Sequence, residues 1–592
     1  FWIARSMARE APAARMAPAA PVDGAARPDP AAAAIRPLNL PVWAGLYALS
    51  GFIALSLELL WFRVLDVFIK SSPYTFGHLL GIYLLFLALG SIVGSLVVHR
   101  SRRPDRVFLL GQWGITVWSA VSLLFLLHLP TDGAVLRGIH EFWGSDAGVE
   151  ISEIAAAWRR LGQGGEATLP LLRAGQVYGL LPLWLLAVPT FLMGLTFAFI
   201  QKAVQTRPEH VGWRVGAIQT SNIAGSILGS LLTGTLLFTL LGTAASFRLL
   251  IVAGSAFGVL AALRSGARRR RGLAVGAVAV SALLASGIPP SDRFWARFHG
   301  SPTSAVVLAE DASSIVALQQ QGPRRAILRV NGTGHSFLPH MAGHFLLGCV
   351  PVLVHPHPEQ VLVIGLGTGT TAWGVGVSPT LQRLDCYEIA RPEYTVIERY
   401  QDRWFECASL AQYLQDPRMH HRFSDGRLAL RLEDRKYDVV EADALEPSMA
   451  YSGNLYSKEF FELCLSGLKP GGMVCTYVPT ERTRLTALAA FPYALDFHAQ
   501  GAPSFILGSL EPIRFDRQAC LDRLDSPAVH AYLGRSHEGE SCRQLLKHYL
   551  DQVSVQEISG ARRDSLLAGR RDFNRDLFPR DEYDKSYVAD YW

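Results

Sequence analysis

Six long apolar runs in the first 290 residues constrain the fold more than any other feature of this sequence. Each is long enough to cross a hydrocarbon core of about 30 Å as a helix, whereas a shorter seventh run at 273–288 reaches only about 24 Å. The pattern predicts a polytopic α-helical membrane domain at 41–290 with six or seven helices, after a disordered Ala/Pro/Arg-rich tail at 1–40. The six runs lie at 42–63, 75–99, 107–130, 176–200, 215–241 and 245–264.

Charge and cysteine content separate the two halves of the chain. Residues 1–288 hold 24 lysines and arginines against 13 acids, a net charge of +11, whereas the remainder holds 32 against 37, a net charge of −5. This asymmetry favours a membrane half followed by a soluble half, and an acidic soluble half argues against nucleic acid as a partner. All seven cysteines lie in the second half without a Cys-x-x-Cys pair, which is typical of free thiols in a reducing compartment.

Basic loops predict how the membrane domain is oriented. They follow alternate apolar runs, at 100–106, 202–214 and 264–271, and basic loops tend to stay in the cytoplasm. The 131–175 connection, with a short amphipathic helix at 151–161, is then expected outside. A full crossing by 273–288 would also put the soluble half outside. Because the free cysteines favour the cytoplasm, we expect 273–288 to be re-entrant or interfacial, and the soluble half to be cytoplasmic.

Two glycine motifs and one carboxylate lie inside the apolar runs. Gly90-x-x-x-Gly94 and Gly225-x-x-x-Gly229 fit close helix packing, although glycine is common in membrane helices generally. Glu58 is costly inside a membrane unless it is paired, so it is either a functional residue or one half of a structural pair with Arg63.

A glycine-rich loop in the soluble half predicts a nucleotide site. The apolar run 360–364 leads into Gly365-Leu-Gly367-Thr-Gly369, where a helix is expected to begin. Glycines let the backbone approach a ligand that side chains would keep away. A second strand ends at Glu388, where a carboxylate can accept hydrogen bonds from both ribose hydroxyls. A tight strand–helix turn in some other α/β domain is the alternative.

Further carboxylates follow the next strands. Asp425 and Gly426 come after a third β-like stretch, and Asp443 and Glu446 come at the end of an apolar strand that begins near Tyr437. Ligands of open α/β sheets bind at this carboxyl edge. The sequence therefore brings several candidate ligand groups to one edge of a sheet.

The soluble half divides into three parts by pattern. Runs at 305–319 and 325–330, with a turn at Asn331-Gly332, predict a small β-hairpin subdomain within 291–355. Residues 356–512 predict an α/β Rossmann-like domain, and 513–592 a helical or irregular extension.

The residues from about 305 to 480 resemble the spermidine synthase (polyamine aminopropyltransferase) branch of the S-adenosylmethionine-dependent methyltransferase fold. The apolar half resembles the multi-pass segment fused to such domains in many bacterial proteins, which implies that the chain lies in a bacterial inner membrane. In the soluble half, the matching phrase is Tyr437-Asp438 … Asp443 … Pro447 … Leu455-Tyr456 … Glu459-Phe460 … Leu468-Lys-Pro-Gly-Gly. In the apolar half, the matching pieces are Ser50-Gly51, Glu58, Trp61, Arg63, Phe86–Ser91, Met193-Gly194, Asn222, Gly225 and Gly229.

The resemblance implies a membrane-bound transferase of polyamine biosynthesis that moves an aminopropyl group from decarboxylated S-adenosylmethionine to an amine. Asp443 would take the proton of the attacking amine, which an alkylammonium with a pKa near 10 must lose. The residues implied to bind the donor are Gly365, Gly367, Gly369, Glu388, Asp425 and Gly426. Those implied to bind the amine are His344, Glu446 and Tyr456. No metal is expected, because no His/Cys/Asp cluster has ligand spacing.

The segment before the glycine loop departs from the family pattern. The acids that hold the diamine in the family are absent between Asn331 and Phe345, where only His344 is in register. A dication would be poorly neutralised without them. His335 and His340 are either substitute polar groups or ordinary packing histidines.

Three functions follow from these patterns. The first is an aminopropyltransferase-like enzyme with the lipid bilayer and a small amine as partners, and the family admits a homodimer. The second is a methyltransferase that uses intact S-adenosylmethionine on a membrane-proximal substrate. The third is a transporter whose soluble domain senses a nucleoside or polyamine.

Overall fold

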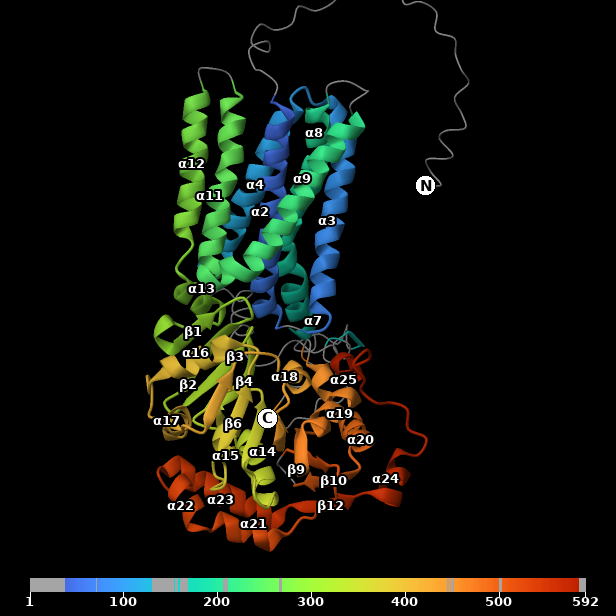
Figure 1. Ribbon diagram of the computed structural model, residues 1–592. Coiled ribbons are helices and arrows are strands. Elements are labelled where there is room, and N and C mark those ends of the chain that lie inside the picture. The colour runs from blue at the N-terminus through green and yellow to red at the C-terminus, as the bar shows by residue number, and fades with distance from the viewer. Residues whose placement is uncertain are drawn as a thin grey trace, which may run out of the picture.

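The computed structural model describes residues 38–129 except 71, 169–205, 211–265, 269–443, 452–499 and 503–584, with a few isolated positions between them. A bundle of long helices stands on one side of a mixed α/β part, and the two meet at one end of the bundle (Figure 1). The expected tail at 1–40 and helix at 151–161 lie almost entirely outside the described residues, and so does Glu446.

The bundle is built from the expected apolar runs. Within the described residues, five helices are long and apolar enough to cross a membrane, or six if α12 and α13, which meet at a 65° bend, form one span. The inner helix α2 is not among these five and has half of its residues buried. The helices are α2 (Leu40–Ile69), α3 (Thr75–Val97), α4 (Pro104–His128), α7 (Leu169–Ala174), α8 (Val188–Val204), α9 (Val211–Leu232), α10 (Phe238–Leu240), α11 (Gly242–Leu263), α12 (Arg270–Gly287) and α13 (Ser291–Phe298).

Small residues let the helices of the bundle approach closely. A Cβ atom built at Gly90 would lie 2.0 Å from the carbonyl oxygen of Phe191 on α8, and one at Gly225 would lie 1.9 Å from that of Ala48 on α2. Both distances are far below van der Waals contact, so only glycine fits at these positions. The Gly-x-x-x-Gly motifs therefore pack α3 against α8 and α9 against α2.

The basic loops and the α/β part lie at opposite ends of the bundle, which contradicts the expectation that they share a side. α12 runs beside α11 along its length instead of turning back, so the chain leaves the bundle at the end far from its arginines (Figure 1). At that far end Lys202 donates to the carbonyl of Val98, and Arg264 pairs with Asp105. The described basic residues there are Arg100, Arg102, Arg103, Arg106, Lys202, Arg214, Arg264 and Arg269–Arg271.

The α/β part contains two sheets. The smaller is a four-stranded antiparallel sheet in sequence order, and Asn331 and Gly332 form its last turn with positive φ angles of 47° and 83°. The strands are β1 (Val306–Glu310), β2 (Ile315–Gly322), β3 (Arg325–Val330) and β4 (Thr333–Leu338).

The larger sheet has the Rossmann-like order β12-β10-β11-β9-β8-β5-β6-β7, with β5 to β9 parallel and β10 to β12 antiparallel. The order reverses beside β5, which lies between β8 and β6. The strands are β5 (Gln360–Ile364), β6 (Arg383–Tyr387), β7 (Met419–Arg422), β8 (Tyr437–Ala442), β9 (Leu468–Tyr477), β10 (Tyr493–His498), β11 (Phe505–Ser509) and β12 (Ser554–Ile558). The accompanying helices are α14 (Ala342–Val354), α15 (Thr370–Val375), α16 (Arg391–Tyr400), α17 (Ala408–Gln415), α18 (Gly426–Leu432), α19 (Lys458–Ser466), α20 (Glu481–Ala490), α21 (Arg517–Leu524), α22 (Pro527–Leu533), α23 (His537–Gln552), α24 (Gly560–Leu567) and α25 (Arg580–Tyr583).

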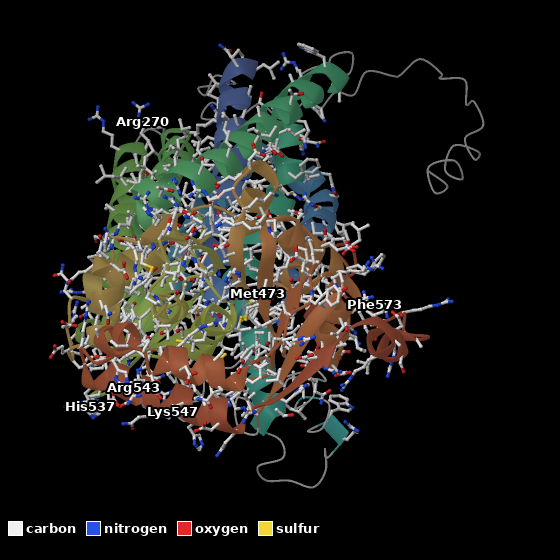
Figure 2. All side chains as sticks on the ribbon, turned by 60° about the horizontal axis from the view of Figure 1, so that its bottom comes forward. Arg270, Met473, His537, Arg543, Lys547 and Phe573 are labelled. Atoms are coloured by element: carbon white, nitrogen blue, oxygen red, sulfur yellow. The ribbon has the colours of Figure 1, made fainter. Side chains whose placement is uncertain are left out.

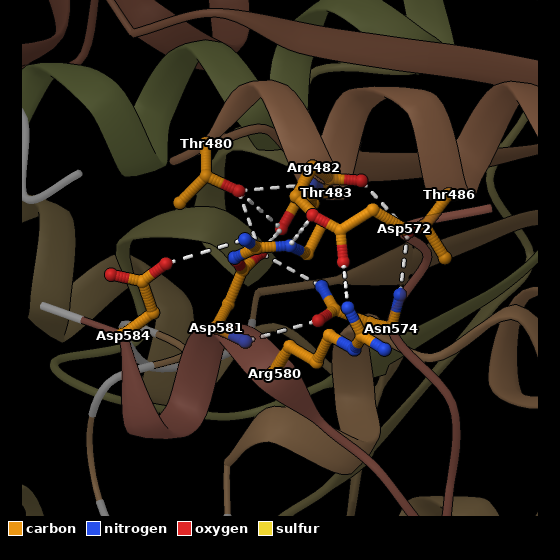
Figure 3. A network of polar contacts seen from close by, with 9 residues as sticks. All are labelled: Thr480, Arg482, Thr483, Thr486, Asp572, Asn574, Arg580, Asp581 and Asp584. Carbon is orange, nitrogen blue, oxygen red and sulfur yellow. Dashed lines mark hydrogen bonds and ion pairs between the residues drawn. The ribbon is translucent and has the colours of Figure 1, made fainter. Parts of the chain in front are cut away.

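The last part of the chain folds back onto the α/β domain through a polar network (Figure 3). Arg482 of α20 pairs with Asp572 at 3.0 Å, with Asp584 at 3.2 Å and with the buried Asp581. The adjacent Glu582 accepts the amide proton of Gly453 at 3.2 Å. The C-terminal segment 572–584 therefore braces the loop that follows β8.

Arg63 joins the helix bundle to the α/β domain. The structural pair between Glu58 and Arg63, one of the two alternatives for Glu58, is wrong: Glu58 interacts with Tyr83, whereas Arg63 reaches out of the bundle. Its guanidinium donates to the carbonyls of Asp311 and Ser314 and lies 3.8 Å from the carboxylate of Glu310. Both members of that pair are about nine-tenths buried, so the contact fixes the orientation of the two parts.

Candidate active site

The carboxyl ends of four neighbouring parallel strands bring the predicted groups together. Gly365 directly follows β5, Glu388 directly follows β6 and Asp443 directly follows β8, while Asp425 is the third residue after β7. Backbone hydrogen bonds continue past the strand ends, from Gly365 to Tyr387 at 2.9 Å and from Asp443 to Ile364 at 3.0 Å. The groups therefore lie along one edge, at the point where the strand order reverses.

Asp443 is held by two side chains from different helices. Its carboxylate oxygens both lie 2.8 Å from Nδ1 of His344 on α14, and one accepts the hydroxyl proton of Thr371 on α15 at 2.6 Å. Burial alone would lower the pKa of His344, but the charge and hydrogen bond of Asp443 raise it above its ordinary value. The imidazole therefore donates from Nδ1 and orients the Asp443 carboxylate.

The glycine loop is shaped by positive φ angles and by close contact with the backbone of Asp443. Gly365, Gly367 and Gly369 have φ angles of 102°, 53° and 81°. A Cβ atom at Gly365 would lie 2.3 Å from the carbonyl oxygen of Asp443. A side chain here would therefore displace the proposed base as well as the loop.

Glu388 and Glu393 place two more carboxyl groups at the loop. Glu388 accepts the amide protons of Leu366 at 2.9 Å and Ala390 at 2.7 Å, while burial raises its pKa. Glu393 in the first turn of α16 is 4% exposed, and its Oε2 has no hydrogen-bond partner among the described residues. Burial, followed by the charge of Glu388, raises the pKa of Glu393 well above its ordinary value.

His335 lies next to Glu393. Its Nδ1 lies 3.9 Å from the Glu393 carboxyl, and burial lowers the pKa of His335 to about 3. The imidazole of His335 and the carboxyl group of Glu393 thus face each other in a buried contact. Of the three histidines in this segment, His335 and His344 reach the site, whereas the half-buried His340 lies near Glu538.

A polar cap and exposed apolar side chains follow the ends of β6 and β7. Asp425 caps α18 by accepting the amide protons of Arg427 and Leu428, and Gly426 is packed against Ile364. Ile389, Phe423 and Leu428 are 68%, 41% and 48% exposed at this edge. Exposed apolar groups beside Glu388, the acid predicted to bind ribose, would suit a flat heterocycle.

Tyr456, predicted to bind the amine, is fully buried in an apolar cluster with Phe460 and Phe461. It offers no surface to a substrate in this conformation, so the structure places it outside the site. Thr371 and Glu393 were missed by sequence reasoning. Thr371 could have been found from its place two residues after the glycine loop, whereas Glu393 gave no signal because charged residues are common in first helical turns. No metal-binding group of three or more His, Cys, Asp or Glu occurs among the described residues.

Comparison with known proteins identifies the family of this domain. Residues 341–486 match the family model of the spermine/spermidine synthase domain. The chain contains a spermidine synthase-like domain. Its relatives include polyamine aminopropyltransferases from Leptospira biflexa serovar Patoc (31% identical over 133 residues, 22% of this chain and 45% of that protein) and from Streptococcus uberis (33% over 125 residues, 21% and 41%). The chain thus spans less than half the length of these relatives.

Solved structures are also similar to the synthase-like domain. A spermidine synthase in complex with the transition state analogue AdoDATO is 17% identical, covers 39% of this chain and 89% of its own, and has a TM-score of 0.31. A human methyltransferase-like protein 13 in complex with SAH is 19% identical and covers 36% and 90%, with a TM-score of 0.25.

Proposed function

We propose that the protein transfers an aminopropyl group from decarboxylated S-adenosylmethionine to an amine. The observation that carries this proposal is the Asp443 carboxylate, which is fixed by His344 and Thr371 at the mouth of the glycine loop. Glu388 lies at the end of the adjacent strand, where it can hold a ribose. The match to polyamine aminopropyltransferases supports the same reaction.

The proposed step needs one base and good alignment. The Asp443 carboxylate takes a proton from the substrate ammonium, and the freed nitrogen lone pair attacks the aminopropyl carbon. The carbon–sulfur bond breaks, and its electron pair turns the sulfonium into the neutral thioether of methylthioadenosine. Because the sulfonium is a good leaving group, the remaining catalysis is the alignment of nitrogen, carbon and sulfur.

Coproduct analysis of the purified full chain tests this function. The protein is incubated with S-adenosylmethionine or its decarboxylated form and a mixed amine pool, and the nucleoside product is measured by mass spectrometry. Methylthioadenosine supports aminopropyl transfer, and S-adenosylhomocysteine would instead indicate methyl transfer. Neither coproduct, despite nucleoside binding, would favour a sensor attached to a transporter.

We also propose that the helix bundle spans a lipid bilayer with its basic loops on the cytoplasmic face and the synthase-like domain on the opposite face. The connections at the far end are rich in arginine, whereas those at 70–74, 241 and 288–290 of the near end contain Lys70 as their one basic residue, and the sequence between α4 and α7, 130–168, has three arginines against six acids. The cysteines do not oppose this orientation, since all seven are buried and buried thiols are inert in either compartment. Decarboxylated S-adenosylmethionine must then be available on the face opposite the cytoplasm.

Thiol labelling of intact cells with a membrane-impermeant maleimide tests the orientation. Arg270 at the far end and Lys547 on the synthase-like domain are both exposed and are labelled in Figure 2. Lys547→Cys is expected to react in intact cells, and Arg270→Cys after permeabilisation only. The reverse pattern would place the domain in the cytoplasm.

A further inference from the structure

A cavity of about 340 Å³ lies where the helix bundle meets the synthase-like domain. Its walls come from α2 and α3, from Phe238 of α10, from the β3–β4 turn and from Met449 in the loop after β8. The volume is that of a small-molecule site. The aminopropyl reaction itself does not need a cavity walled by these helices, so the cavity calls for a separate explanation.

The cavity lies next to the candidate active site at His335. This residue lines the cavity and lies 3.9 Å from the carboxyl group of Glu393, which interacts with the Gly367 backbone and with Asp443. One end of a molecule in the cavity would therefore lie beside His335, close to these acids. Glu393 Oε2, buried and without a hydrogen-bond partner in the described part of the chain, is the kind of acceptor that an incoming ammonium would satisfy.

The other end of the cavity is apolar and lies at the base of the bundle. Phe62, Phe76, Leu79 and Phe238 line it, and the Phe76 ring at the start of α3 is 54% exposed. The outward face of α3 continues with exposed apolar side chains from Leu84 to Leu96. An apolar chain lying along α3 in a bilayer would therefore meet the cavity without crossing water.

The charges of the wall do not suit a free diamine. Among the described residues that line the cavity, Arg63 and Asp66 are the charged ones, and they carry opposite charges. A second ammonium would be buried beside a wall with no net negative charge, which is costly. An acceptor with one amine and an apolar remainder avoids this cost.

We propose that this cavity binds the acceptor, and that the acceptor is a membrane-borne amphiphile with a single primary amine. The amine lies towards His335, Glu393 and Asp443, and the apolar chain lies between Phe76 and Phe238 and continues along α3 into the bilayer. This inference rests on the proposed aminopropyl transfer and names the substrate class of that site.

A homologous series of amines tests the inference on the full chain in lipid nanodiscs with decarboxylated S-adenosylmethionine. Butylamine, octylamine, dodecylamine and putrescine are compared by the rate of methylthioadenosine formation. We expect kcat/KM to rise with chain length by up to about fourfold for each methylene group that the cavity buries. Putrescine is expected to be a poorer acceptor than octylamine.

Variants separate binding in the cavity from the concentration of long amines in the bilayer. Phe76→Ala and Phe238→Ala are expected to flatten the dependence of kcat/KM on chain length, whereas Phe125→Ala is expected to keep the dependence of the unchanged protein. Phe125→Ala is the matched control, because Phe125 is 50% exposed on α4 and does not line the cavity.

Three results would overturn the inference, and they differ in what else they refute. Methylthioadenosine formation that does not depend on chain length, or that depends on it equally in all variants, would refute the amphiphile and leave aminopropyl transfer standing. Preference for putrescine would do the same. No methylthioadenosine from any amine would refute the proposed function and this inference together.

Discussion

Replacing Asp443 by asparagine tests both the chemistry and the electrostatics of the site. The Asp443→Asn change keeps the shape of the side chain but removes its charge, and the resulting amide cannot take the amine proton. Loss of a general base typically lowers the rate by about 10²–10⁴-fold. We expect kcat for methylthioadenosine formation to fall within this range while the Kd of the donor changes little.

The same variant has a pH-dependent stability defect. His344 has a raised pKa in the folded protein because of Asp443, so this pair stabilises the fold below about pH 6.5, and the stabilisation is lost as the pH rises through the folded pKa. Hydrogen bonds to charged groups contribute about 1.5–3 kcal/mol each. We expect Asp443→Asn to lose about that much at pH 5.5 and clearly less at pH 8, measured by thermal unfolding in detergent.

Asp416→Asn is the matched control. Arg418 lowers the pKa of Asp416 against the opposing effect of burial, so this pair stabilises the fold above the ordinary aspartate pKa and equally at pH 5.5 and 8. The control should keep its kcat and lose the same stability at both pH values. An Asp443→Asn protein with unchanged kcat, or with equal stability losses at both pH values, would refute the reasoning.

Three further predictions concern other parts of the molecule. Glu393→Gln should raise Tm by several degrees at pH 8 and by little at pH 4, because the folded state holds a proton that the unfolded chain releases above its ordinary pKa; equal shifts at both pH values would contradict this. Glu388→Gln should raise the KM of the donor at least tenfold with a smaller change in kcat, and an unchanged KM would exclude a ribose-binding role. Arg63→Met should destabilise the junction by about 3 kcal/mol, because the buried Glu310 carboxylate loses its counter-ion while it keeps the hydrogen bonds from Thr243, and the effect should be seen as faster limited proteolysis between the two parts; Arg102→Met, at the far end, is the control.

The sequence predicted the order of the elements because its periodicities are strong and local. The apolar runs became the helices of the bundle, and the glycine loop, Glu388 and Asp443 followed parallel strands as expected. Parallel strands bring residues that are distant in sequence to one edge, so the positions of these groups could be inferred from the strand pattern alone.

The contacts between the two halves could not be predicted in this way. Arg63 was expected to pair with Glu58 five residues away, but it binds Glu310 and the β1–β2 turn, because the folded domain offers buried carbonyls that the local sequence does not show. The length of 273–288 is marginal for a bilayer, yet α12 is supported along its length by α11. Glu393 became part of the site through the packing of α16, which no spacing rule describes.

The most direct test of the central claim is the coproduct formed by the full chain with decarboxylated S-adenosylmethionine and an alkylamine in nanodiscs. The geometry at Asp443 predicts methylthioadenosine at a rate that falls at least a hundredfold in Asp443→Asn while the donor still binds. Methylthioadenosine at equal rates in both proteins, or none from either although the donor binds, would contradict aminopropyl transfer at this site.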